Sequence, residues 1–121
     1  MVTTTSSSTP APPTQAAGES RWGNLSVAHE GTLTRVWIEG VLDALTAPQV
    51  REALDRIVDE KPPRVLLDLS RLRIIDGHGI RVIAQLCTRL RQVGCEFSLA
   101  GAQQQPLAVL KLFNLDRAIT G

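Results

Sequence analysis

The fold is decided by Val65-Leu66-Leu67-Asp68-Leu69-Ser70 and, three residues later, by Ile74-Ile75-Asp76-Gly77-His78-Gly79-Ile80. The first stretch is an almost unbroken apolar run, which is typical of a central strand covered on both faces. Residues 70–76 predict a loop. Asp76 predicts the N-cap of a helix that ends near Gly94, a suitable left-handed cap. A strand that leads through a loop into a helix is the basic unit of an α/β fold.

Shorter patterns on either side of this unit complete the predicted fold. Thr46, with Gln49 three residues later, matches a capping box at the start of an earlier helix. The other predicted elements are strands at 25–29, 33–42 and 95–99, the helix that begins at Thr46 and stops at Lys61-Pro62-Pro63, and a helix from Pro106 through Phe113. Residues 118–120 leave open a short last strand. Because strands joined through helices run parallel, this order predicts an α/β fold: a mixed sheet with an antiparallel N-terminal hairpin plus parallel strands, and helices packed on it.

Composition indicates one globular domain. The 121 residues are 43% hydrophobic and 21% charged, with a formal net charge of +1 and 3% aromatic residues, which gives no reason to expect nucleic-acid binding. Fifteen of the first twenty residues are Thr, Ser, Pro or Ala, so we predict a disordered tail at 1–21 and one domain at 22–121. Because the sequence has neither a signal-peptide pattern nor about 18 consecutive apolar residues, we expect a cytoplasmic protein without membrane insertion.

We find no catalytic motif and predict that the chain is not an enzyme and has no cofactor or metal site. The glycine-rich phosphate-binding, zinc-protease and nucleophile-elbow patterns are all missing from the sequence. His29 and His78 lie on different predicted elements, and Cys87 and Cys95 lack the spacing of metal ligands. Cys87 falls on the apolar face of its helix, which favours a core role over that of a reactive thiol.

The loop Asp76-Gly77-His78-Gly79 is the best candidate for a functional site. Two glycines in three positions are unfavourable inside a helix and fit a sharp bend or a close approach of another surface. The exposed amides of a helix N-terminus favour a nearby anion. Residues 71–91 contain five Arg and one acidic residue, so this helix also offers a basic patch to an acidic partner. A tight strand-to-helix connection and a solvated helix face are the simpler interpretations of the same residues.

The two opening stretches resemble the signature of the STAS domain, and within that family they are most similar to the bacterial anti-sigma factor antagonists. Glu39-Gly40-Val41-Leu42-Asp43 is similar to the turn that follows the second strand in this family. Leu99-Ala100-Gly101 and Leu115-Asp116 match its C-terminal spacing. The resemblance covers residues 23–120. It implies a STAS fold and a protein that acts by binding another protein.

The resemblance also implies a mode of regulation. In that family, the unphosphorylated domain binds an anti-sigma factor that is also a serine kinase. The kinase then phosphorylates a Ser or Thr just before the last Gly of the loop, which weakens binding. Here that position is His78, and Gly77 precedes it, so we expect no hydroxyl switch at this site. Asp76 matches the acidic residue beside the phosphosite of this family, and Asp43 matches the acidic residue on the neighbouring loop. The predicted partner-binding residues are Asp43, Asp76, Gly77, His78, Gly79, Ile80 and Arg81.

Three protein-binding functions remain open at this point. The leading hypothesis is an anti-sigma factor antagonist that works by partner switching in sigma factor control. The alternative is the STAS subunit of an ABC-type phospholipid transport system, which would dock on the transporter ATPase. The segment Lys111-Leu112-Phe113-Asn114-Leu115 would suit the third helix of that family. A STAS-like module within a signalling scaffold is the third.

Overall fold

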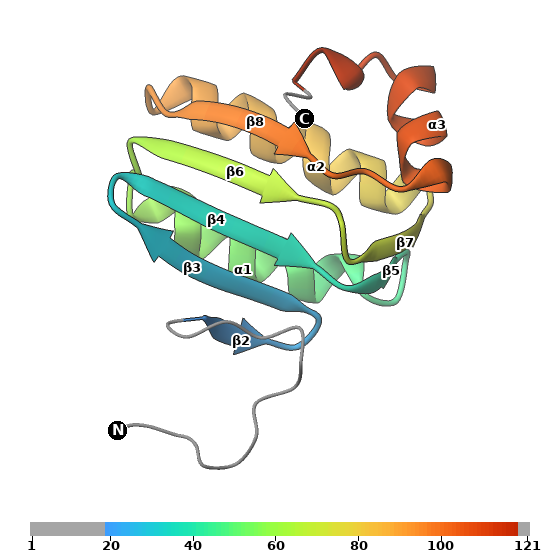
Figure 1. Ribbon diagram of the computed structural model, residues 1–121, viewed down its shortest axis with the longest axis horizontal. Coiled ribbons are helices and arrows are strands. Elements are labelled where there is room, and N and C mark those ends of the chain that lie inside the picture. The colour runs from blue at the N-terminus through green and yellow to red at the C-terminus, as the bar shows by residue number, and fades with distance from the viewer. Residues whose placement is uncertain (1–18, 119–121) are drawn as a thin grey trace.

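The structure, a computed structural model, describes residues 19–118, which form two sheets and three α-helices (Figure 1). The strands are β2 (Ser20–Trp22), β3 (Leu25–Glu30), β4 (Leu33–Ile38), β5 (Gly40–Leu42), β6 (Arg64–Asp68), β7 (Leu72–Ile75) and β8 (Glu96–Ala100). The helices are α1 (Ala47–Asp59), α2 (Gly77–Gln92) and α3 (Gln104–Leu112), and a 3-10 turn follows at Asp116–Ala118. The main sheet has the order β2-β3-β4-β6-β8. Because β2, β3 and β4 pair antiparallel and β4, β6 and β8 pair parallel, the predicted α/β fold with a mixed sheet is confirmed.

Strand β6 lies between β4 and β8, as the apolar run at 65–69 predicts. Val65, Leu67 and Leu69 are buried against the helices. The prediction that this strand is covered on both faces is wrong. Both long helices lie on one face of the main sheet (Figure 1), and the alternate side chains Leu66 and Asp68 are only half-buried. Leu66 and Asp68 both point to the open face. Because Leu66 is apolar, the alternation between the two faces shows in the sequence only at Asp68.

The predicted strand at 33–42 is broken at Glu39. Strand β4 ends at Ile38, and Gly40 has φ +76°, a left-handed conformation that favours glycine. Beyond this bend, β5 leaves the main sheet and pairs in parallel with β7, which lies inside the segment predicted as a loop at 70–76. The amide of Gly40 donates to the carbonyl of Arg71 at 2.9 Å and starts this small second sheet. Strands of three and four residues are too short to give a recognisable alternation.

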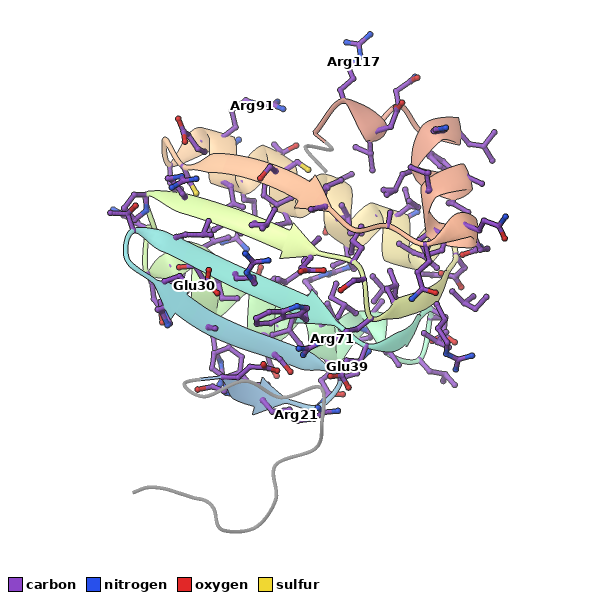
Figure 2. All side chains as sticks on the ribbon, in the orientation of Figure 1. Arg21, Glu30, Glu39, Arg71, Arg91 and Arg117 are labelled. Carbon is purple, nitrogen blue, oxygen red and sulfur yellow. The ribbon has the colours of Figure 1, made fainter. Side chains whose placement is uncertain are left out.

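The N-terminal boundary also differs from the prediction. Strand β2 begins at Ser20, so the predicted division between residues 21 and 22 falls inside a strand that pairs with β3. Arg21 forms an ion pair with Glu39 at 2.6 Å, and Glu19, whose side chain is fully buried, bonds Arg71 at 2.7 Å. Figure 2 shows Arg21, Glu39 and Arg71 gathered at one end of the sheet. The predicted disorder of residues 1–18 and most of the strand considered at 118–120 lie outside the described residues.

Helix α1 starts by a different mechanism from the predicted capping box. Thr46 occupies the N-cap, but its hydroxyl donates to the carbonyl of Val41 at 2.9 Å and accepts from the amide of Asp43. The carboxylate of Asp43 accepts from the amides of Leu45 and Thr46 at 3.0 and 3.1 Å. Asp43 therefore orders the turn between β5 and α1, and no side-chain cap bond forms at Thr46.

The other two helices match their predicted patterns closely. Helix α2 turns Ile80, Ile83 and Leu90 into the core, and Gly94 follows it with φ +78°. Helix α3 begins two residues before Pro106 and is followed by Asn114 with φ +60°, as expected for a C-terminal turn. Among the described helices, none is long and apolar enough to cross a membrane.

On the open face of the sheet, charged side chains pack around the ring of Trp37. Arg71 lies 4.4 Å and Arg35 lies 5.8 Å from the centre of its ring. Arg35 donates to Asp68 at 3.1 Å, and the amide of Ser70 donates to the other carboxylate oxygen at 2.9 Å. Partial burial alone would raise the pKa of Asp68, but the hydrogen bonds from Ser70 and Arg35 and the charge of Arg35 outweigh it and lower that pKa.

This shift predicts a specific acid sensitivity. Because folding lowers the pKa of Asp68, its carboxylate stabilises the fold above about pH 4, and that contribution is lost as the pH falls further. We expect Asp68→Asn to lower the free energy of unfolding at pH 7 and to flatten its decline between about pH 4 and pH 2. Urea unfolding followed by tryptophan fluorescence measures both effects, with Glu96→Gln, at an 82% exposed side chain, as the control. An acid limb in Asp68→Asn as steep as in the unaltered protein would contradict the prediction.

Candidate functional site

The predicted N-cap of the second long helix is confirmed. Asp76 adopts an extended conformation, and one carboxylate oxygen accepts from the amides of His78 and Gly79 at 2.9 and 3.1 Å. The other oxygen lies 3.5 Å from Nδ1 of His78. The hydrogen bond from the backbone amide of Gly79 has the largest effect on the pKa of Asp76 and lowers it. Burial alone would raise this pKa, but the hydrogen bonds from His78 lower it further, so the pKa lies below its usual value. Asp76 is therefore a carboxylate at neutral pH, with one oxygen occupied by the helix.

The small second sheet places the two predicted acidic loops side by side. In the parallel pair, Leu42 of β5 is opposite Ile75 of β7, and the amide of Asp76 donates to the carbonyl of Leu42 at 3.1 Å. Asp43 and Asp76 therefore follow the ends of neighbouring strands. Asp43 is half-buried, and its carboxylate accepts hydrogen bonds from two amides of its own turn. Its main role is therefore to order the turn beside the site.

The two glycines of the loop have different roles. A Cβ on Gly79 would lie 2.7 Å from both the side chain and the carbonyl of Leu42, and equally close to Ile75, so this position requires glycine for close packing. A Cβ on Gly77 would meet nothing within 4 Å. Of the two explanations inferred from the sequence for these glycines, a close approach of another surface applies at Gly79. At Gly77 the backbone has open space around it.

The predicted contact surface is smaller than the sequence suggested. Gly79 is buried, and Ile80 is 4% exposed in the core, so neither presents a side chain to a partner. Gly77, His78 and Arg81 are exposed, and the side chain of Asp76 is 43% exposed. We call residues 76–78 with Arg81 the tip. The buried pair shapes the tip from below because helix α2 must rest on β5 and β7.

An exposed aromatic side chain lies beside the tip, and the sequence analysis did not include it among the contact residues. Phe113, which follows α3 and is 54% exposed, shares a surface hollow with Asp76, Gly77, His78 and Arg81. Leu45 and Ile74 are also exposed and lie two residues from Asp43 and Asp76 respectively. Their signal in the sequence was apolar residues that fit no buried stripe. Exposed apolar groups beside a polar centre are typical of a protein-binding surface.

The positive charge counted in residues 71–91 is partly neutralised. Arg89 pairs with Asp55 and reaches Asp59, and Arg71 pairs with Glu19 and Glu39. Within residues 19–118, Arg73, Arg81 and Arg91 form no ion pair. Only part of the positive charge counted in the sequence is therefore available to an acidic partner.

The residues considered for enzymatic chemistry do not come together. His29 lies near Glu60, on a different element from His78. Burial raises the pKa of Cys87 to about 11 and also raises that of Cys95, so both are protonated, weak nucleophiles at neutral pH. In the described part of the chain, no cluster of three His, Cys, Asp or Glu side chains could hold a metal ion.

Comparison with known families identifies the fold. The model of the STAS domain matches residues 24–120. The chain belongs to the STAS domain family. The match spans the tip and all three helices, so the resemblance stated from the sequence is confirmed.

Several relatives of this STAS domain are anti-sigma factor antagonists. It is 39% identical over 62 residues to BtrV of Bordetella bronchiseptica, whose name places it among these antagonists; the match covers 51% of this chain and about half, 53%, of BtrV. Its fold is similar to that of an antagonist from Mycobacterium paratuberculosis, with 23% identity, a TM-score of 0.70, and 77% and 79% of the two chains covered. The unphosphorylated antagonist SpoIIAA from Bacillus gives 14% identity, a TM-score of 0.71, and coverage of 79% and 85%. At these identities the solved structures establish the shared fold.

The two glycines of the STAS loop provide a matched test of this packing. We expect Gly79→Ala to lower the free energy of unfolding by about 1–3 kcal/mol, because its Cβ would overpack against Leu42 and Ile75. Gly77→Ala has open space and should leave stability unchanged or raise it by about 0.5–1 kcal/mol, since alanine is the better helix former. Thermal and urea unfolding measure both changes. Equal effects at the two positions would show that α2 does not need a bare backbone at Gly79.

Proposed function

We propose that this STAS domain is an anti-sigma factor antagonist that binds an anti-sigma factor through its tip. The observation that carries the proposal is the exposed tip with Phe113 beside it, presented by short strands and a capped helix. The name of the relative BtrV and the fold shared with other antagonists support the same partner class. Binding frees the sigma factor by competition and needs no catalytic residue on this chain.

We also propose that the tip lacks the usual hydroxyl switch. SpoIIAA, whose fold is similar, is known in unphosphorylated and phosphorylated forms. The family position of the phosphorylated residue corresponds to His78, which follows Gly77, and neither side chain has a hydroxyl. Phosphorylation there would add nearly two negative charges beside the Asp76 carboxylate, and this chain cannot undergo that serine chemistry. Its tip therefore binds constitutively, and any regulation acts elsewhere.

A charge placed on the tip tests the proposed contact. We expect His78→Glu to weaken binding to a purified serine-kinase-like anti-sigma factor from the same genome by about tenfold or more. The variant adds a negative charge that the bound partner would bury at the contact. Isothermal titration calorimetry measures the affinity. Thr32→Glu is the control, since Thr32 is exposed in the turn between β3 and β4, at the end of the sheet away from the tip (Figure 1).

Unchanged affinity in His78→Glu would show that the tip is not the contact. If affinity capture with the full chain recovers an ABC transporter ATPase and no kinase-like protein, the antagonist function is wrong and the transport alternative replaces it.

Restoring hydroxyls tests the missing switch. We expect the double variant Gly77→Ser/His78→Ser to incorporate phosphate when incubated with the anti-sigma factor kinase and ATP, whereas the unaltered chain does not. Mass spectrometry locates the phosphate, and loss of affinity should follow because of charge repulsion. Phosphate on the tip of the unaltered chain would contradict the proposal, as would a double variant that stays unmodified with a kinase shown to be active on another antagonist.

A further inference from the structure

A groove runs between α1 and α2 on the side of the helices away from the sheet. It encloses about 520 Å³. Its floor is apolar and is formed by Leu54 and Val58 from α1 and by Val82 and Leu86 from α2. Arg81 and Ala84 line both this groove and the hollow at the tip. The groove is therefore continuous with the proposed contact and extends it along α2.

The walls of the groove carry an excess of positive charge. Arg51, Arg81 and Arg89 line it together with the single acidic residue Asp55. Asp55 is paired with Arg89. Within residues 19–118, neither Arg51 nor Arg81 forms an ion pair. Both guanidinium groups are free to bind carboxylates, in the bidentate geometry that arginine favours.

The shape and polarity of the groove suit an amphipathic helix. Helix α2 has 16 residues and is about 24 Å long, which gives an incoming helix several turns of contact. The apolar floor would take one face of that helix, and Gln85 and Gln92 add neutral hydrogen-bonding groups to the wall.

A second copy of this chain is a poor occupant. Helices α2 and α3 contain no acidic residue. In α1, Asp55 and Asp59 already face Arg89 of the same chain, which leaves Glu52 as the single acidic side chain of that helix with no ion pair within residues 19–118. None of the described helices can therefore supply a free row of carboxylates to Arg51 and Arg81, and a different protein must do so.

We propose that the groove between α1 and α2 binds an acidic amphipathic helix of the anti-sigma factor, whose carboxylates bond Arg51 and Arg81. This inference rests on the proposed function and adds to it a second contact and the chemistry of the partner. The tip fixes one end of the complex, and the groove reads the charge of the partner helix.

Charge reversal separates the groove from the tip. We expect Arg51→Glu to weaken binding to the anti-sigma factor by about tenfold and to reduce the salt dependence of the affinity, because it removes one attractive pair and adds repulsion. Arg51→Lys should retain most of the affinity. Arg91→Glu makes the same charge change on α2, where Arg91 points away from the body of the molecule (Figure 2) and lines neither hollow; its affinity should stay within about twofold.

The two proposals fail in different ways. If Arg51→Glu binds like Arg91→Glu while His78→Glu is weakened, the groove is wrong and the tip stands. If neither Arg51→Glu nor His78→Glu affects binding, the proposed function fails as well. Circular dichroism and thermal melting of each folded variant exclude unfolding as the cause.

A cross-link tests the identity of the occupant directly. The photoreactive residue p-benzoylphenylalanine in place of Gln85 should cross-link to a segment of the anti-sigma factor with several Asp or Glu at helical spacing. The same residue in place of Arg91 should give no such product. A cross-link from position 85 to a second copy of this chain, or to a partner segment without acidic residues, would overturn the inference.

Discussion

The close approach of α2 to β5 at Gly79 is the constraint on which the site depends. The helix can rest on Leu42 and Ile75 only because residue 79 has no side chain. The same contact fixes the parallel register of β5 and β7, with the amide of Asp76 bonded to the carbonyl of Leu42. Both loops at this end of the molecule therefore occupy set positions, and the exposed residues between them are held by buried ones. If the tip binds as proposed, a surface built in this way loses little conformational entropy when a partner arrives.

The two acidic side chains at this end of the molecule support its structure. The carboxylate of Asp76 caps the helix and that of Asp43 orders its own turn, so both carboxylates are engaged in shaping this end of the molecule. The outward-facing groups are the imidazole of His78, part of the Asp76 carboxylate, a bare backbone at Gly77 and the apolar side chain of Phe113, with Arg81 beside them. On the proposed function, such a surface would select its partner by shape and charge.

The sequence predicted the parts of the fold whose signals are long or local. The apolar run at 65–69 located the central strand, and Asp76 located the start of α2, because burial and capping act on neighbouring residues. The break at Gly40 and the β5–β7 pair were missed, since their strands are too short to show a period and pair across thirty residues of chain. Strand β2 depends on ion pairs with Glu39 and Arg71 that come from distant elements. At the site, the cap was predictable, but the burial of Gly79 and Ile80 and the exposure of Phe113 are decided by tertiary packing.

The two cysteines, half-buried Cys87 and buried Cys95, have a practical consequence for spectroscopy. With a pKa of about 11, the Cys87 thiol is ionised in only about one molecule in several thousand near pH 7.5, and burial also raises the pKa of Cys95. Maleimide and methanethiosulfonate reagents attack thiolates, so the native chain should label slowly. A cysteine introduced at the solvent-facing position 78 can therefore carry a spin label or fluorophore without first removing the natural ones, and its spectrum reports the local environment of that end of the helix in solution.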